Sequence, residues 1–204
     1  MPSKPAPALH LKEACLIAAR EVIAEHGVEG LSMRDVARKL GVSHQAPYRH
    51  FESRDHLLAE VIRRCFVEFA EHLDRGQPAQ DCEDGMSSMG SNYMHYAEQK
   101  PLEYRLMFGT PWPEPAQHPD LVRYAAHAFN LLRNSLRHKH GGGASARKTA
   151  DLDALFIWAS LHGLASIKQA NVMAHLDLSP KVIASAQSHM MRKISIAMNN
   201  DSET

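Results

Sequence analysis

The sequence contains few cysteines and no excess of charge of either sign. Its 204 residues include only three cysteines, at positions 15, 65 and 82, and their spacing fits no zinc or dithiol motif. We therefore expect a reducing environment, in which Cys15 and Cys65 serve as small apolar residues on helix faces. The 23 basic and 23 acidic residues cancel. A nucleic-acid site must therefore be a local basic patch.

No segment of the sequence is apolar enough to suggest a membrane span. The uncharged runs are all shorter than the roughly 20 residues that cross a bilayer. Residues 1–7 are polar and proline-rich, and no apolar stretch follows them, so we expect no signal peptide. Hydrophobic residues still make up 44% of the chain, which is enough to fill a core. These features predict a soluble cytoplasmic protein without a membrane partner.

Motifs that carry enzyme or cofactor chemistry are also missing. We find no nucleophile–histidine–acid order, no phosphate-binding glycine loop and no paired carboxylates, so we predict neither an enzyme nor a cofactor. His138 and His140 have no acid or cysteine beside them at metal-ligand spacing, and we interpret them as an exposed basic helix end. His162 lies on an apolar face, where a hydrogen-bonded core histidine is expected.

Apolar residues recur with a helical period along almost the whole chain, and no alternating pattern indicates a strand. We therefore predict an all-α protein. The expected helices span residues 9–26, 33–40, 43–51, 54–73, 81–100, 101–108, 120–140, 148–175 and 180–199. Four prolines between residues 110 and 119 predict a loop there, because a helix interior does not tolerate proline.

Residues 32–54 have the form of two short capped helices joined by a tight turn. Ser32 is followed three residues later by an acid, and Gly41 ends the first segment. Ser43 is the next cap candidate and opens a very short helix. Such a pair predicts a helix-turn-helix, with Val42 filling the joint between the two helices.

The second short helix carries side chains that suit DNA. Ser43, His44 and Gln45 are short enough to reach base edges in a major groove, whereas the later polar residues can hold phosphates. Residues 32–54 contain five basic and two acidic residues, a local charge of +3. An ordinary solvated helix surface is the alternative interpretation of this charge.

The stretch "LSMRDVARKLGVSHQAPYRHFESRDHLLAEVI", within residues 9–64, resembles the DNA-binding domain of the TetR family of bacterial transcriptional regulators. The resemblance implies that double-stranded DNA is a partner and that Val42 and Phe51 belong to the core. It implies bases read by Ser43, His44 and Gln45, and phosphates held by Tyr48, His50 and Arg54. The full set of predicted DNA-binding residues is Ser32, Arg34, Ser43, His44, Gln45, Tyr48, His50 and Arg54.

Pro47 departs from the family pattern, which usually has leucine at this position. Proline lacks the backbone N–H group and disfavours α geometry at the preceding Ala46. We therefore expect a recognition helix that is rotated or that starts late.

The C-terminal sequence predicts a regulatory domain that forms a homodimer. "FIWASLHGLASI" (156–167) and "YRLMFG" (104–109) resemble the Trp-His-Gly subgroup of such domains. Stripes of small and apolar residues on the last two predicted helices favour a four-helix dimer interface. The predicted interface residues are Leu155, Ala159, His162, Gly163, Ser166, Ile183, Ala186, Met190 and Ile194. Alternatively, the stripes cover the core of one subunit.

Aromatic and methionine side chains concentrate in the middle helices, where they predict a pocket for a small apolar or aromatic effector. The candidates are Tyr93, Met94, Tyr104, Met107, Phe108, Trp112, Tyr124, His127 and Phe129. Ordinary core packing explains each of them singly as well.

The sequence thus predicts a flexible tail (residues 1–8), a helix-turn-helix domain (9–55) and a ligand-binding and dimerisation domain (56–204). The predicted function is a repressor that binds a near-palindromic operator as a dimer and that an effector releases. The alternative is an all-helical small-molecule-binding or enzymatic bundle whose helix-turn-helix no longer contacts DNA.

Overall fold

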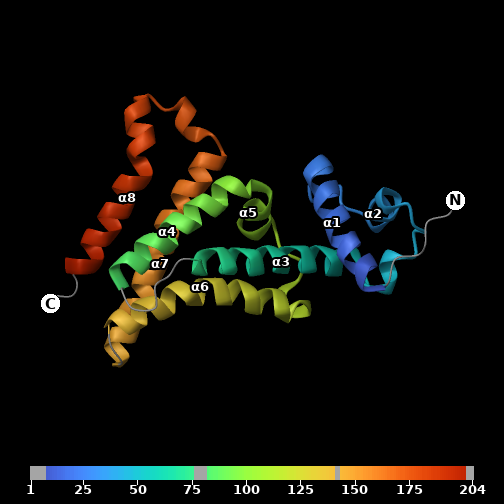
Figure 1. Cartoon of the computed structure of the whole chain (residues 1–204), viewed down its shortest axis with the longest axis horizontal. Coiled ribbons are helices and arrows are strands. Elements are labelled where there is room, and N and C mark those ends of the chain that lie inside the picture. Colours follow the sequence, from blue (N-terminus) through green and yellow to red (C-terminus); the bar gives the residue numbers. More distant parts are fainter. Residues whose placement is uncertain (1–7, 76–81, 141–142, 201–204) are drawn as a thin grey trace. The chain divides into compact units, whose positions relative to one another are not determined.

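The computed structural model describes residues 8–75, 82–140 and 143–200, and these residues form helices joined by turns, with no strand among them (Figure 1). The predicted all-α class is confirmed. The α-helices are α1 (Ala8–His26), α2 (Met33–Leu40), α3 (Arg54–Asp74), α4 (Cys82–Gln99), α5 (Pro101–Phe108), α6 (Pro119–His140), α7 (Ala144–Gln169) and α8 (Pro180–Asn200). Three short 3₁₀ helices are η1 (Pro47–Arg49), η2 (Pro115–Gln117) and η3 (Val172–His175). None of the described helices is both long and apolar enough to cross a membrane.

The chain divides into two compact units, which we describe separately. The N-terminal unit comprises residues 1–66 and 105–125, and the C-terminal unit comprises 67–104 and 126–204. Helices α3, α5 and α6 each contribute residues to both units. Of the predicted tail over residues 1–8, only Ala8 is among the described residues, and it begins α1.

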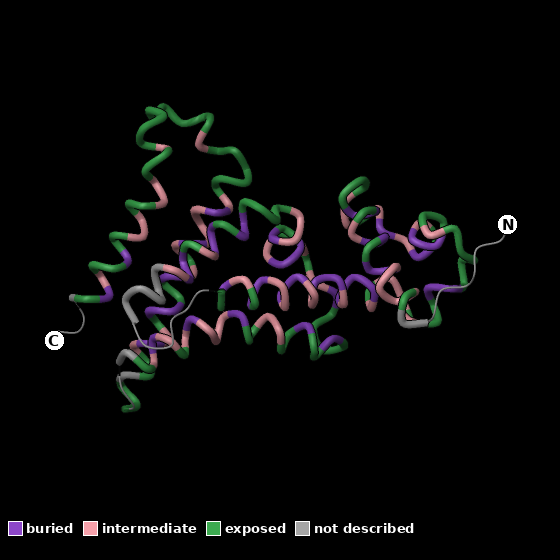
Figure 2. Tube along the Cα trace, viewed as in Figure 1, coloured by how far each residue is buried: buried purple, intermediate pink, exposed green. Residues whose placement is uncertain are grey.

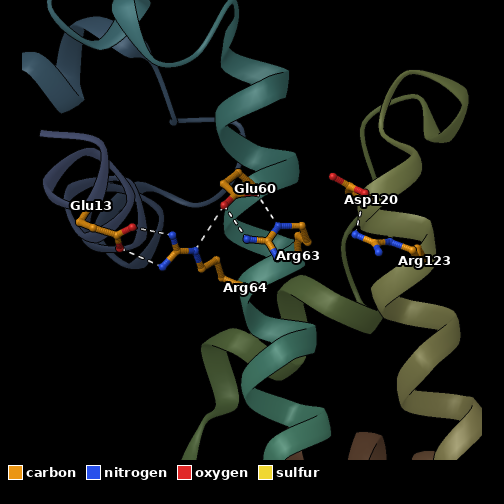
Figure 3. Close-up of polar contacts among 6 residues, drawn as sticks. All are labelled: Glu13, Glu60, Arg63, Arg64, Asp120 and Arg123. Atoms are coloured by element: carbon orange, nitrogen blue, oxygen red, sulfur yellow. Dashed lines mark hydrogen bonds and ion pairs between the residues drawn. The ribbon is translucent and has the colours of Figure 1, made fainter. Parts of the chain in front are cut away.

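The N-terminal unit is held by an apolar core and by a chain of ion pairs. Helices α1, α2 and α3 bury their apolar faces, and buried residues alternate with exposed ones along each of them (Figure 2). At the edge of this core, Arg64 of α3 donates to both carboxylate oxygens of Glu13 in α1, at 2.5 and 2.9 Å. Arg64 also reaches Glu60, which Arg63 holds in turn at 2.6 and 2.7 Å (Figure 3). The bidentate geometry fixes the side of α1 that faces α3.

The C-terminal unit is built on the packing of α4 against α7 and α8. Gly90 of α4 lies against the side-chain end of Met191 in α8, and a Cβ atom at this position would overlap that methionine. The glycine therefore leaves room for the end of the Met191 side chain beside α4. Ile194 and Met198 of α8 are both buried.

Several helix ends differ from the predicted ones. Helix α6 begins at Pro119 rather than Asp120, because the first turn of a helix has no use for the missing proline N–H. Helix α7 begins at Ala144 rather than Lys148, and it ends at Gln169 rather than His175 because Asn171 is left-handed, with φ 53°. The predicted loop over 110–119 contains the turn η2. Residue 81, where the helix over 81–100 was expected to begin, lies outside the described residues.

We predict that Gly41→Ala lowers the stability of the protein by about 1 kcal/mol, because Gly41 is left-handed with φ 65° and alanine is strained there. No atom lies within 4 Å of the added Cβ, so backbone strain alone is tested. The measurement is urea unfolding. Gly41→Asn is the matched comparison: asparagine tolerates the left-handed region better than alanine does, so this variant should lose less stability. Equal losses for the two variants would contradict the assignment.

Candidate functional site

Helix α2 has the two caps that the sequence predicted. Ser32 Oγ accepts a hydrogen bond from the Asp35 backbone N–H at 3.1 Å and donates to the Asp35 carboxylate at 2.5 Å. The bond from Ser32 holds the pKa of the Asp35 carboxyl below its usual value. At the other end, left-handed Gly41 donates to Arg38 and Val42 donates to Ala37, so the chain reverses directly after the helix.

We call residues 43–50, which follow this reversal, the reading segment. It is not the α-helix that was predicted for residues 43–51. Residues 44–46 form a turn, and the 3₁₀ helix η1 follows. Its hydrogen bonds join Ala46 to Ser43, Arg49 to Ala46 and His50 to Pro47, each three residues apart, at 2.9 to 3.2 Å. The physical reason is Pro47, which has no N–H group to bond the carbonyl of Ser43.

The late start expected from Pro47 is therefore confirmed, but the expected change at Ala46 is wrong. Ala46 keeps α geometry, with φ −61° and ψ −44°. Ala46 and Pro47 are both buried and fill the joint after α2. Val42, which was expected in that joint, is 37% exposed. The left-handed turn at Gly41 directs the chain away from the core at Val42, and the chain reaches the core again at Ala46. Phe51 is buried, as the resemblance implied.

The tip of the reading segment presents polar side chains to solvent. Ser43, His44, Gln45 and Tyr48 are all exposed, and His50 is half-buried. Gln45 Nε2 lies 3.0 Å from His44 Nε2, so the amide donates to the imidazole. This bond orients the Gln45 amide and leaves its carbonyl oxygen and one N–H free for another partner.

The basic residues of this region differ in how far their charges are engaged. Arg38 pairs with Asp35, and Lys39 pairs with Glu21 and Glu25. Those contacts occupy two of the five positive charges. Two further cations, Arg34 and Arg49, are exposed, and neither forms a hydrogen bond or an ion pair through its side chain within the described part of the chain.

Arg54 has a structural contact that the sequence did not indicate. Its guanidinium donates to the backbone carbonyls of Leu31 at 2.9 Å and Val28 at 2.5 Å, and it also pairs with Asp55 at 3.0 Å. These bonds use three of its five donors and attach the start of α3 to the turn between α1 and α2. Its phosphate contact stays a prediction, as does that of Ser32, whose hydroxyl caps α2.

The C-terminal unit contains a chain of hydrogen-bonded side chains. Tyr93 and Tyr104 join through their hydroxyls at 2.9 Å, and the Tyr104 hydroxyl lies 2.7 Å from Nδ1 of His162. His162 Nε2 lies 3.4 Å from Ser166 Oγ. Burial raises the pKa of both phenols, that of Tyr104 to about 12, and lowers the pKa of His162. The predicted hydrogen bonding of His162 is thus confirmed, although the side chain is half-buried rather than in the core, and the ring is neutral at pH 7.

The nine predicted ligand-binding residues divide between the two units, and their ligand roles stay predictions. In the C-terminal unit Tyr93, Met94 and Tyr104 are buried, while His127 is exposed and Phe129 half-buried. The other four belong to the N-terminal unit: Met107, Phe108, Trp112 and Tyr124.

Those four residues of the N-terminal unit pack around α3. The Phe66 ring makes edge contacts with Phe108 and Trp112, and Trp112 Nε1 donates to the carbonyl of Met107 at 2.9 Å. The Tyr124 ring has the guanidinium groups of Arg63 and Arg123 each 4.9 Å from its centroid.

The predicted dimer residues differ in exposure between α7 and α8. On α7, Leu155 is 50% exposed and Ala159 is exposed, beside the exposed apolar side chains of Leu152 and Phe156. His162, Gly163 and Ser166 are half-buried. A Cβ atom on Gly163 would meet no atom within 4 Å. On α8, Ile183, Ala186 and Met190 are half-buried and Ile194 is buried within the unit.

Sequence reasoning missed the polar residues that join distant helices. The spacing of Glu60, Arg63 and Arg64 is readable as helical ion pairing, but no local signal pairs Arg64 with Glu13. Within the described residues, no three side chains of histidine, cysteine or acids come together as metal ligands. The side chain of His140, part of the sequence considered for metal binding, lies outside that description.

Comparisons with known proteins by sequence and by fold give the same result. Residues 16–61 match the family model "Bacterial regulatory proteins, tetR family", and residues 86–191 match "Tetracyclin repressor-like, C-terminal domain". The HTH-type transcriptional regulator Rv1816 of Mycobacterium tuberculosis is 31% identical over 104 residues, which cover 50% of this chain and 44% of that protein. The chain therefore matches less than half of that relative's length.

Two solved structures share the fold. A putative regulatory protein, SCO4313, has a TM-score of 0.76 at 24% identity, over 94% of this chain and 98% of that one. The structure of TetR-Q116A from Acinetobacter baumannii AYE in complex with minocycline has a TM-score of 0.60 at 18% identity, over 93% and 96%. The Trp-His-Gly subgroup of the C-terminal domain stays a prediction.

We predict that the protein loses stability as the pH falls below 6.5, in part through His162. Burial lowers the pKa of His162 from 6.5, so below this pH the unfolded chain binds a proton that the folded chain does not. In urea unfolding between about pH 7.5 and about pH 5.5, His162→Gln should reduce the slope by up to about one proton. Tyr104→Phe should lower stability at every pH and leave the slope unchanged, because burial rather than Tyr104 shifts this pKa. An unchanged slope in His162→Gln would refute the assignment.

Proposed function

Because the chain belongs to the tetR family of bacterial regulatory proteins, we propose that it is a dimeric repressor that binds a near-palindromic DNA operator. In this proposal a small apolar or aromatic molecule releases it from the operator, and it works in the cytoplasm. Members of this family regulate transcription through a helix-turn-helix and are not enzymes, in agreement with the sequence prediction.

The exposed tip of the reading segment is the observation that carries the proposal. A duplex major groove is about 12 Å wide and presents donors and acceptors that differ for each base pair. The amide of Gln45, oriented by His44, has one free N–H and a carbonyl oxygen, the pair of groups that contacts adenine in a bidentate manner. Ser43 adds a hydroxyl that can contact a base. The exposed cations Arg34 and Arg49 lie near these residues in the sequence and can bind backbone phosphates.

The phosphate contacts predicted for Tyr48 and His50 are part of this proposal. Tyr48 is 48% exposed and projects from η1, so its hydroxyl is available to a backbone phosphate. Arg49, also in η1, supplies the charge that the engaged guanidinium of Arg54 supplies less readily. We therefore propose that residues of the turn contact bases and that residues of η1 contact phosphates.

Dimerisation is proposed through the exposed face of α7. Leu152, Leu155 and Phe156 are each about half exposed, an unusual amount of apolar surface for one helix. Glycine in a helix interior costs about 1 kcal/mol relative to alanine, and nothing within the subunit needs the space at Gly163. Close approach of a second subunit would explain this glycine. The half-buried residues of α8 would then contribute to the interface indirectly, by holding α7 in position.

A dimer places two reading segments on one duplex. Two such segments enter successive major grooves when they lie about 34–36 Å apart, which requires a near-palindromic operator. Helix α3 contributes residues to both units, so a ligand-dependent shift of this helix would change the spacing and weaken binding. One structural neighbour is a complex of TetR-Q116A with minocycline, and this supports the proposal that a small molecule acts on this chain as well.

We predict that Gln45→Ala weakens binding to the selected operator by about 10- to 100-fold, because a bidentate base contact is lost. Binding to mixed-sequence DNA should change little, since phosphate contacts are retained. The operator is first selected from random duplexes with the natural protein, and affinities are then measured by fluorescence anisotropy at fixed salt. Gln99→Ala, an exposed glutamine of α4, is the control and should bind as the natural protein does. If no duplex is selected, the DNA-binding proposal fails and the non-DNA-binding bundle is favoured.

We predict that Leu155→Glu raises the dimer dissociation constant by about tenfold or more, because it buries an unpaired charge in the interface. Gly163→Leu should do the same through steric overlap with the second subunit, since the added Cβ meets no described atom of its own subunit within 4 Å. Sedimentation velocity over a range of concentrations measures the effect, with circular dichroism to verify folding. Ile17→Glu, at an apolar side chain of α1 that is 60% exposed, should leave assembly unchanged. A folded Leu155→Glu variant that dimerises normally would exclude this face.

A further inference from the structure

A cavity in the N-terminal unit has no part in the function proposed above. It measures about 200 Å³ and lies where α3 meets the start of α6. Its lining consists of His56, Ala59, Glu60 and Arg63 from α3 and of Gln117, His118, Pro119, Asp120 and Leu121 from the opposite segment. Figure 3 labels Glu60 and Arg63 on one side and Asp120 on the other. The sequence predicted a role for none of these residues.

His118 is a buried polar side chain that lines this cavity without a hydrogen bond. It is 8% exposed, and within the described residues its ring makes one aromatic contact, an edge-on approach to His56 with centroids 4.8 Å apart. His56 is occupied by Ser53, whose hydroxyl lies 3.0 Å from its Nδ1. Burial lowers the pKa of His118, so the neutral ring offers one donor and one acceptor. Neither ring nitrogen is among the fully buried atoms of the described residues, so a molecule in the cavity can reach the ring.

The first turn of α6 adds backbone donors to the same cavity. Because the helix begins at Pro119, the next two N–H groups, of Asp120 and Leu121, have no acceptor among the described residues. Leu121 is buried and is one of the residues that line the cavity. N–H groups at a helix start carry partial positive charge and bind anionic oxygens.

Arg63 offers the cavity a free hydrogen-bond donor. It uses Nε and Nη2 to hold Glu60, and its Nη1 has no hydrogen-bond acceptor among the residues that the structure describes. Both oxygens of Glu60 are occupied by Arg63, and Arg64 makes a further bond to one of them. The Asp120 carboxylate is paired with Arg123 through Oδ1, at 2.9 Å. Each acid thus has an ion-pair partner, and the anion would share the Arg63 guanidinium with Glu60.

We propose that this cavity binds a small molecule through a carboxylate or phosphate group, held by Arg63 Nη1, the Leu121 N–H and His118. Pockets for drug-sized ligands span about 300–1,000 Å³, so this ligand is smaller. The cavity lining includes none of the residues predicted to contact the apolar effector, although the Arg63 guanidinium lies 4.9 Å from the ring centroid of one of them, Tyr124. It lies on α3, the helix that follows the reading segment, and its occupant contacts both α3 and α6.

Titration of the full-length, ¹⁵N-labelled protein with sodium phosphate or sodium acetate tests the proposal, with sodium chloride keeping the ionic strength constant. At least one probe should shift the Leu121 amide and the His118 ring resonances in a saturable way, with a dissociation constant on the order of 1 mM. The probe with the lower dissociation constant shows whether the cavity prefers a phosphate or a carboxylate group. The test uses no DNA, so its outcome is independent of the proposed repressor function.

Two variants locate the binding. Arg63→Gln and His118→Phe should each weaken it by roughly tenfold, because each removes a donor to the anion. His138→Gln, on an exposed side chain of the same helix α6, should leave it unchanged. Circular dichroism verifies folding, and if His118→Phe does not fold, Arg63→Gln decides alone. The proposal is overturned if neither probe gives a saturable shift, or if Arg63→Gln binds as tightly as the natural protein.

Discussion

The missing N–H group of Pro47 is the constraint on which the proposed DNA-reading surface depends. Without this donor the chain cannot close an α-helical bond to Ser43, and the segment after Gly41 becomes a turn followed by one 3₁₀ turn. The ring of Pro47 is buried, so it also serves as the apolar plug beneath the segment. His44 and Gln45 therefore lie at the outside of a tight turn, where they bond to each other. A leucine at this position would allow a longer helix with the same side chains in other directions.

Polar contacts hold this short segment in place where secondary structure alone would not. A 3₁₀ turn of three residues has little stability of its own. Arg54 attaches the beginning of α3 to the carbonyls of Val28 and Leu31, and Arg64 attaches the middle of the same helix to Glu13 of α1. These charge-assisted bonds fix the position of α3, the helix that follows the reading segment, against α1 and the turn before α2. Exposed ion pairs contribute little to stability, but a bidentate pair contributes strongly to orientation.

Polar groups inside this protein differ in how they are satisfied. In the C-terminal unit the hydroxyls of Tyr93 and Tyr104 and the His162 ring bond to one another, and this network joins α4 and α7 through Tyr104. Nε2 of His72 in the same unit is buried and has no hydrogen-bond partner among the described residues. A histidine without a partner therefore does not by itself mark a binding site, and the proposal for His118 rests on the cavity that His118 lines together with Arg63 and the first turn of α6.

Local features of this protein could be predicted from the amino-acid sequence: the helical class, the cap Ser32, the end of α2 at Gly41 and the late start forced by Pro47. These depend on residues within four positions of one another, and sequence spacing records such contacts. Only the folded chain shows that Arg54 bonds Val28, 26 residues away, that Arg64 bonds Glu13, 51 away, and that Tyr104 meets His162, 58 away. Folding also determines which side of each apolar stripe faces solvent, as the exposed side chain of Val42 illustrates. Periodicity places side chains on a face of a helix, but the packing of the whole chain determines what that face contacts.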